Sequence, residues 1–309
     1  MTKKHMPGLH HVTAISGAPQ ANVDFFTKVM QQRLVKKTVN FDDPGTYHLY
    51  YGNQTAEPGT ILTFFPFADA GPGRAGPGMA SAYAYSLGGK DFDSWMERLA
   101  LDAIDFDGPE ERFGQRVVKV ADPDGAKVEL VEVDGTGGPT LDGFHSVTLH
   151  LDDLSPTHRL LTDVFGYEEI GHESKDGEER LRLAAAGNLR ADLRGGVVDL
   201  MRSDAPTIGR QGAGSIHHVA FRALDDADQL DWRERLLAVG MQVTPVIDRQ
   251  YFNAIYFREP GGVLFEIATD PPGFTRDEPL ESLGQSLKLP AQYEASRDRI
   301  EQILPPLVA

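Results

Sequence analysis

Residues 259–267, EPGGVLFEI, repeat without a gap the pattern of residues 122–130, DPDGAKVEL. Each stretch is typical of the end of one strand, a tight turn with proline and glycine, and a second strand with buried apolar positions. Glu266 in one copy stands where Glu129 stands in the other. A repeated supersecondary pattern is the mark of an internally duplicated fold, so further copies are expected along the chain.

Four similar units follow one another, at about residues 9–67, 80–133, 144–202 and 216–269. In each, an alternating strand pattern precedes a helix pattern of period 3.6, and further strand patterns follow. The expected helices include 18–30 and 156–164, and the expected strands of unit four include 242–247. Such βαβββ units, taken in pairs, predict an α+β fold with two half-barrel clefts.

Segments rich in glycine and proline divide these units. A loop at 68–80 separates units one and two, and a linker at 134–143 separates units two and three. We therefore expect two domains of two modules each, 8–133 and 143–270, and a tail, 271–309, that ends in a helix at 291–304.

The dipeptide His-His begins the first strand of unit one, as His10 and His11, and of unit four, as His217 and His218. Side chains alternate along a strand, so one histidine of each pair can point into a barrel. With Glu266, two such imidazoles form a 2-His-1-carboxylate set, which suits non-heme Fe(II). Spacing alone leaves open which histidine of each pair points inward. The alternative is that each pair contains a buried, hydrogen-bonded core histidine.

Aligning the units shows that only one complete ligand set exists. At the position of His11 and His218, unit three has Ser146, and unit two has no histidine in its first strand. Units one and four together supply His, His and Glu266, whereas units two and three offer Ser146 and Glu129. The sequence predicts one metal site per chain and a vestigial second cleft, in which Glu129 is a relic or a salt-bridge partner.

Composition narrows the classes of function. The net charge of −16 disfavours a nucleic-acid partner, which needs a basic face. The chain has no cysteine, which excludes thiolate catalysis and leaves His, Asp and Glu as metal ligands. The residues before Gly8 form no apolar secretion signal, and no apolar run approaches the length of a membrane span. We expect a cytoplasmic protein without a membrane partner.

The order of motifs resembles the vicinal oxygen chelate superfamily, and more closely the hydroquinone and chlorohydroquinone ring-cleaving dioxygenases. The segments that carry the resemblance are GLHHVT at 8–13, YHLY at 47–50, RFGQR at 112–116, IHH at 216–218, PGGVLFE at 260–266 and GFT at 273–275. The resemblance implies an Fe(II)-dependent, extradiol-type dioxygenase that acts on a hydroquinone-like aromatic diol with O₂. It also implies that His11, His218 and Glu266 hold the metal, for which Mn(II) is a credible substitute.

The resemblance further implies a catalytic role for four residues near the metal. His10, His217 or Tyr256 would move protons, because each can lie beside the ligands, and histidine titrates near neutral pH. Arg249 would place a fixed positive charge near a phenolate or carboxylate. The alternatives are a core aromatic for Tyr256 and a surface cation for Arg249. For His48 and Tyr50 we favour a structural role.

Two other functions fit the same superfamily. A metal-dependent isomerase or lyase of glyoxalase type would use zinc or nickel, generally with a fourth protein ligand, and no fourth ligand is evident here. A non-catalytic small-molecule binder would need no His-His-Glu set. Metal analysis separates the three readings. The oligomeric state stays open, with a homo-oligomer as one option.

Overall fold

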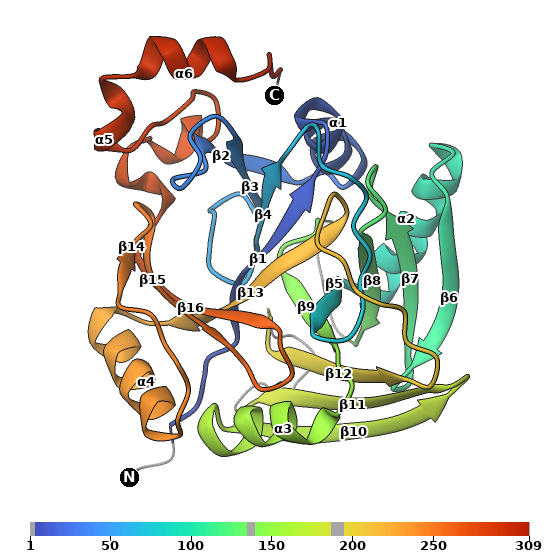
Figure 1. Cartoon of the computed structure of the whole chain (residues 1–309). Helices are drawn as coiled ribbons and strands as arrows, with labels where there is room; N and C mark the ends of the chain where they lie inside the picture. The colour runs from blue at the N-terminus through green and yellow to red at the C-terminus, as the bar shows by residue number, and fades with distance from the viewer. Residues whose placement is uncertain (1–3, 135–139, 187–194, 309) are drawn as a thin grey trace.

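Two curled eight-stranded sheets form the body of the protein (Figure 1). The computed structural model describes residues 4–134, 140–186 and 195–308, so half of the expected linker, residues 135–139, lies outside the described residues. Strand β13 of the first sheet contacts β5 of the second, which places the sheets side by side. Each sheet has one concave face, which is where a small molecule can be enclosed.

The first sheet combines units four and one. Its strands, in spatial order, are β14 (Ile247–Asp248), β15 (Phe252–Arg258), β16 (Leu264–Pro272), β13 (Ser215–Ala223), β1 (Leu9–Ser16), β4 (Ile61–Pro66), β3 (Tyr47–Gly52) and β2 (Arg33–Val39). At its centre, β1 and β13 pair antiparallel, and each pairs in parallel with the last strand of its own unit.

The second sheet combines units three and two in the same way. Its strands, in spatial order, are β10 (Tyr167–Lys175), β11 (Glu178–Ala185), β12 (Val197–Ser203), β9 (Phe144–His150), β5 (Met79–Gly88), β8 (Lys127–Val133), β7 (Gln115–Ala121) and β6 (Phe106–Arg112). The segments 8–133 and 143–270 thus each contribute one module to each sheet, and neither half-barrel is confined to one segment.

One helix per module covers the outer faces of the sheets (Figure 1). The helices are α1 (Pro19–Asp24), α2 (Gly89–Leu101), α3 (Leu154–Arg159) and α4 (Asp226–Ala238). The α1 and α3 helices each continue into a single π-helical turn, so the predicted helices 18–30 and 156–164 contain two kinds of turn. In α4, Asp225 caps the first turn, and Trp232 and Leu236, one turn apart, are fully buried. The predicted α+β fold of four βαβββ modules in two half-barrels is confirmed.

Three elements differ from the sequence prediction, all at the edges of the fold. Strand β6 was not predicted, because it is an edge strand with largely exposed charged residues and no apolar alternation. The strand expected at 242–247 is reduced to β14, since Pro245 lacks a backbone donor. The single tail helix expected at 291–304 is wrong: the structure has two short helices, α5 (Ala291–Glu294) and α6 (Arg297–Ile303).

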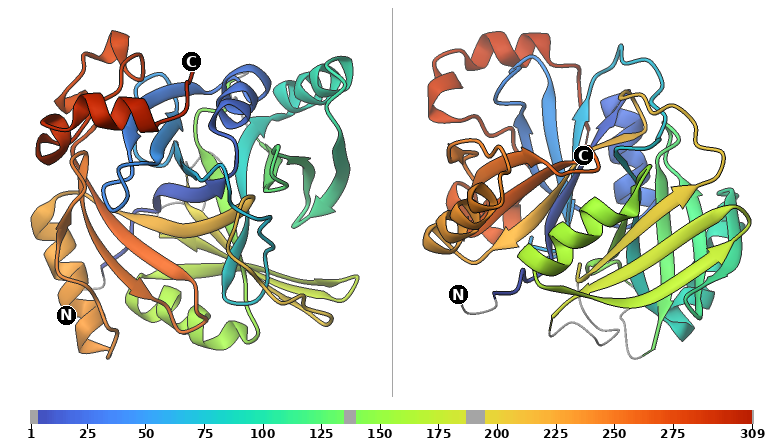
Figure 2. Two further views of the ribbon diagram at one scale, coloured as in Figure 1. Left: turned by 45° about the horizontal axis from the view of Figure 1, so that its top comes forward. Right: turned by 60° about the horizontal axis from the view of Figure 1, so that its bottom comes forward.

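The tail is fastened to the first sheet beside β2 (Figures 1 and 2). Lys36 of β2 is completely buried, and its Nζ lies 2.6 Å from Asp277 Oδ1 and 2.5 Å from Glu278 Oε2. The same ammonium lies over the ring of Tyr251, 4.8 Å from its centroid. A buried cation with two carboxylates and an aromatic face holds the tail against the barrel.

In the described part of the chain, no helix is long and apolar enough to cross a membrane.

Candidate metal centre

The two central strands of the first sheet bring the predicted ligands together. In the antiparallel ladder, His11 lies opposite Ala220 and Thr13 opposite His218. Ala220 lies beside Glu266 in the parallel ladder of β13 and β16. The two histidines and the glutamate therefore share the concave face, although they come from opposite ends of the chain.

The three ligand groups converge on one point. Their ligand atoms lie within 4.8 Å of one another. Glu266 Oε2 lies 2.9 Å from His218 Nε2 and 3.4 Å from His11 Nε2, and the two Nε2 atoms are 3.3 Å apart. All three side chains are buried. Among the described residues, this is the one such group of three His, Asp or Glu side chains.

The surroundings of Glu266 fit a bound cation. Its two carboxylate oxygens are fully buried, and neither has a hydrogen-bond partner of acceptable geometry among the described residues. Burial by itself would raise the pKa of Glu266, but the charge of His11 and the close nitrogens of both histidines hold that pKa well below its ordinary value. A buried carboxylate is costly unless a positive charge faces it. A divalent metal between three donors would supply that charge.

Each predicted ligand histidine is held by the histidine that precedes it. His10 Nδ1 lies 2.9 Å from His11 Nδ1, and His217 Nδ1 lies 2.8 Å from His218 Nδ1. A histidine that binds metal through Nε2 carries its hydrogen on Nδ1, so the preceding histidine accepts that hydrogen bond.

The preceding histidines are suited to accept these bonds, because both are neutral. Burial lowers the pKa of His10 far below its usual value and lowers the pKa of His217 to about 4. The doubled dipeptide thus places one histidine at the centre and one behind it.

A cavity of about 430 Å³ opens above the three groups. Its wall is largely aromatic, and the aromatic lining residues are Phe41, Tyr50, Phe65, Phe67, Phe252 and Tyr256. His217 also lines the cavity, whereas His10 does not. A cavity of this volume with an aromatic lining suits a flat aromatic ring.

Tyr256 and Arg249 lie in the cavity wall and contact each other. Tyr256 is opposite Glu266 in the ladder of β15 and β16, and its ring centroid is 5.9 Å from that of His218. Arg249 Nε donates to the Tyr256 hydroxyl over 3.2 Å, and Arg249 Nη1 pairs with Asp42 over 3.1 Å. Burial, followed by the charge of Glu266, raises the pKa of Tyr256 well above its usual value, so its hydroxyl keeps its proton.

A chain of four hydrogen-bonded side chains was not recognised in the sequence as part of the site. Tyr50 Oη lies 2.8 Å from His48 Nδ1, and His48 Nε2 lies 2.7 Å from Thr63 Oγ1, which is 3.1 Å from Thr13 Oγ1. His48, Tyr50 and Thr13 all line the cavity. Side chains two residues apart on a strand lie on the same face, so the sequence could have placed Thr13 on the face of His11, and Tyr50 on the face of His48.

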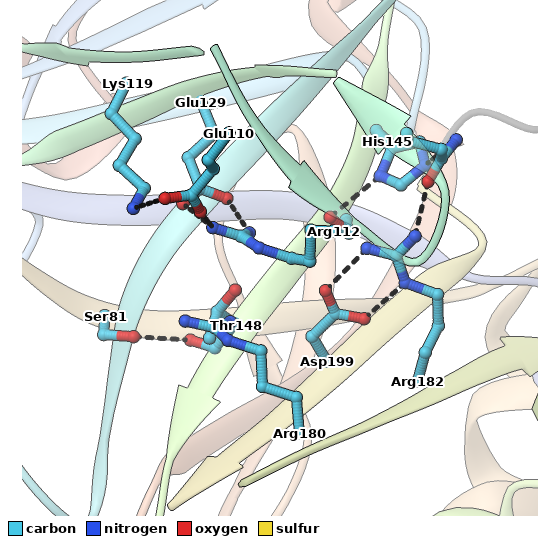
Figure 3. A network of polar contacts seen from close by, with 12 residues as sticks. Ser81, Glu110, Arg112, Lys119, Glu129, His145, Thr148, Arg180, Arg182 and Asp199 are labelled. Atoms are coloured by element: carbon cyan, nitrogen blue, oxygen red, sulfur yellow. Dashed lines mark hydrogen bonds and ion pairs between the residues drawn. The ribbon is translucent and has the colours of Figure 1, made fainter. Parts of the chain in front are cut away.

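The position of Glu129 in the second sheet holds an ion pair instead of a ligand set. Arg112 Nη1 and Nη2 donate to the two carboxylate oxygens of Glu129 over 2.7 and 3.0 Å (Figure 3). Both side chains are buried. The prediction of Glu129 as a salt-bridge partner therefore agrees with the geometry.

Comparison with known proteins agrees with this geometry. The family model described as "Glyoxalase/Bleomycin resistance protein/Dioxygenase superfamily" matches residues 8–130 and 143–267. The "Putative ring-cleaving dioxygenase MhqO" of Bacillus subtilis (strain 168) is 45% identical over 317 residues, which cover 99% of this chain and 98% of the relative. The "Chlorohydroquinone/hydroquinone 1,2-dioxygenase" of Sphingobium indicum is 35% identical over 317 residues, covering 96% of this chain and 95% of the relative.

A solved structure is similar over the whole length. The crystal structure of a "putative dioxygenase" from Bacillus subtilis has a TM-score of 0.90 and 45% identity, and each chain covers 99% of the other. The two half-barrels described above are therefore also the fold of this solved protein.

Proposed function

The chain belongs to the Glyoxalase/Bleomycin resistance protein/Dioxygenase superfamily, and from this we propose that it is an Fe(II)-dependent, extradiol-type dioxygenase that opens the ring of a hydroquinone-like aromatic diol. Relatives that span nearly the whole chain carry the names of ring-cleaving dioxygenases, and one carries the name of a hydroquinone dioxygenase. The observation that carries the proposal is the convergence of His11, His218 and Glu266 at the floor of an aromatic-lined cavity.

The donor set determines which metal chemistry is available. Two neutral imidazoles and one carboxylate leave a face of the coordination sphere open, and ferrous iron bound there supplies the activation of O₂ and of a phenolic oxygen. Mn(II) accepts the same ligands. No fourth His, Asp or Glu joins the group among the described residues, which disfavours a glyoxalase-type site with four protein ligands.

The remaining residues of the cavity act on the substrate and its protons. The aromatic wall would orient the ring and exclude water, which strengthens every polar contact inside. His217 lines the cavity as a neutral imidazole, and because its Nδ1 accepts a hydrogen bond from His218, its Nε2 carries the hydrogen and would donate it to a substrate oxygen. The Tyr256 hydroxyl would hold a proton close to Glu266, and Arg249 would stabilise negative charge that develops on the ring oxygens. His10 would act through His11 by holding its ring.

The test is anaerobic loading with Fe(II), addition of hydroquinone and air, and measurement of O₂ uptake together with the ultraviolet absorbance of a ring-opened product. The proposal predicts uptake that requires both iron and the diol. Absence of uptake with hydroquinone, chlorohydroquinone and catechol would overturn it. Turnover of a glutathione hemithioacetal by the zinc- or nickel-loaded protein would favour the isomerase instead.

A further inference from the structure

The second half-barrel contains a cavity of its own, and it has nearly the volume of the first. It measures about 410 Å³ and lies on the concave face of the second sheet. Its lining residues come from β5, β7, β8, β9, β11 and β12, which occupy the places of the strands that line the first cleft.

The strand registers allow the two cavities to be compared position by position. Ser146 lies opposite Ala84, as His11 lies opposite Ala220. Ala84 lies beside Glu129, as Ala220 lies beside Glu266. Ser146 and Ala82 therefore stand where His11 and His218 stand, so the second cleft lacks both imidazole ligands.

An arginine lies against the carboxylate that a metal would otherwise face. Arg112 pairs with Glu129 and also with Glu110, over 2.7 Å (Figure 3). Arg182 pairs with both oxygens of Asp199 over 2.8 Å, in the same network. Guanidinium groups thus satisfy the buried carboxylates, and no cation is needed there.

The wall of the second cavity has changed from aromatic and apolar to polar, with three cationic side chains and one histidine at the corresponding positions. By the same registers, Arg180 replaces His48 and Lys119 replaces Tyr256. Lys127 replaces Leu264, and His150 replaces Ile15. All four replacements line the cavity. These substitutions favour a different class of ligand in the second cavity, although the two cavities have nearly the same volume.

Two of these groups have buried hydrogen-bonding atoms without a partner among the described residues: His150 is buried, and Arg180 is partly buried, with its side chain 13% exposed. Arg180 Nε and Nη2 bind Glu178, but Nη1 is buried and has no partner among the described residues. His150 is 7% exposed, and its Nε2 is also buried without a partner. A buried donor that is left unsatisfied in this way is a costly feature that a ligand would remove.

The charges around the cavity leave an excess of cations. The lining carboxylates Glu129 and Glu178 are paired with Arg112 and Arg180, and Lys119 is paired with Glu110 over 2.8 Å. Lys127 and Arg74 also line the cavity and have no carboxylate within ion-pair distance among the described residues. This local positive charge stands out in a chain whose net charge is −16.

We propose that the second cleft is a binding site for a small organic carboxylate. Arg180 and the buried imidazole of His150 would bind the carboxylate, and Lys127 and Arg74 would add charge around it. The cavity is as large as the one proposed to take an aromatic ring, so a ligand with a carbon skeleton fills it better than a bare inorganic anion. The site is independent of the dioxygenase reaction and needs no metal.

The test is calorimetric titration of the metal-loaded protein with succinate, and in parallel with inorganic phosphate. We expect saturable binding of one succinate per chain and weaker binding of phosphate. Arg180→Gln should weaken succinate binding at least about tenfold, because a buried charge-assisted bond is lost. Arg202→Gln is the matched control: Arg202 pairs with Glu179 over 2.9 Å on the neighbouring strand but does not line this cavity.

Two further variants keep the test decisive. Lys127→Gln removes an exposed charge at the cavity and should weaken binding even if Arg180→Gln fails to fold. Glu266→Gln should bind succinate as tightly as the unaltered chain, because it changes only the first cleft. No saturable succinate binding, phosphate binding at least as tight as succinate, an equal loss in Arg202→Gln, or a loss in Glu266→Gln would each overturn the proposal.

Discussion

Replacing His10 by leucine should weaken metal binding although His10 does not face the metal position. His10 is 2% exposed, and its Nδ1 lies 2.9 Å from His11 Nδ1. In the variant, the Nδ1 hydrogen of His11 loses its acceptor inside the core, and the ring loses the contact that fixes its orientation. Loss of such a supporting hydrogen bond typically costs 10- to 100-fold in metal affinity, or about 1.4–2.7 kcal/mol.

The second half-barrel offers a matched control for this variant. His145 is 5% exposed, and its Nδ1 lies 2.9 Å from Ser146 Oγ, in the position that corresponds to His10 and His11. His145→Leu removes the same kind of buried bond, but beside a serine. Fe(II) or Mn(II) affinity would be measured by competition with a chromophoric chelator. Unchanged affinity in His10→Leu, or an equal loss in His145→Leu, would refute the reasoning.

Three further predictions concern the ion pair, a buried turn and the cavity wall. Arg112→Met should lower the free energy of unfolding by about 3–5 kcal/mol, because Glu129 is left as an unpaired buried charge; Arg112→Met combined with Glu129→Gln should recover most of that loss, as measured by urea denaturation. Burial raises the pKa of Asp122 from 3.8 to about 6, so its contribution to stability is fully present below about pH 4 and is lost as the pH rises through 6. Asp122→Asn should remove this pH dependence of the free energy of unfolding, which amounts to at most about 3 kcal/mol. The variant should therefore be the more stable chain at pH 7 in thermal denaturation, and an unchanged pH dependence would contradict this. Tyr256→Phe should keep its metal and lower kcat about 10- to 100-fold, since only the hydroxyl bound by Arg249 is lost; full activity would assign Tyr256 a packing role.

The sequence was most informative where the repeat could be compared with itself. Aligning Glu129 with Glu266, and Ser146 with His11, predicted which units share a site before any contact was known. The edge elements were not predictable in this way, because β6 pairs on one side only and carries exposed charges. The alternation of a buried strand is therefore missing there.

The sequence also does not predict which residues pair with the buried charged groups. Arg112 of β6 binds Glu129, and Glu129 lines a cavity that also takes Arg180 from β11 of unit three, so this arrangement depends on how units two and three pair. The hydrogen-bonded side chains of His48, Tyr50, Thr63 and Thr13 could not be predicted for the same reason, because they come from three strands. Contacts of this kind follow from sheet order, which local patterns do not specify.

The central claim is that this chain inserts both atoms of O₂ into an aromatic diol. The most direct measurement combines an oxygen electrode with mass spectrometry of the product, using the Fe(II)-loaded protein and hydroquinone. We expect one O₂ to be consumed per hydroquinone and a product heavier than the substrate by two oxygen atoms. A product that has instead lost two hydrogens, as a quinone has, or O₂ uptake that is unchanged in Glu266→Gln, would contradict it.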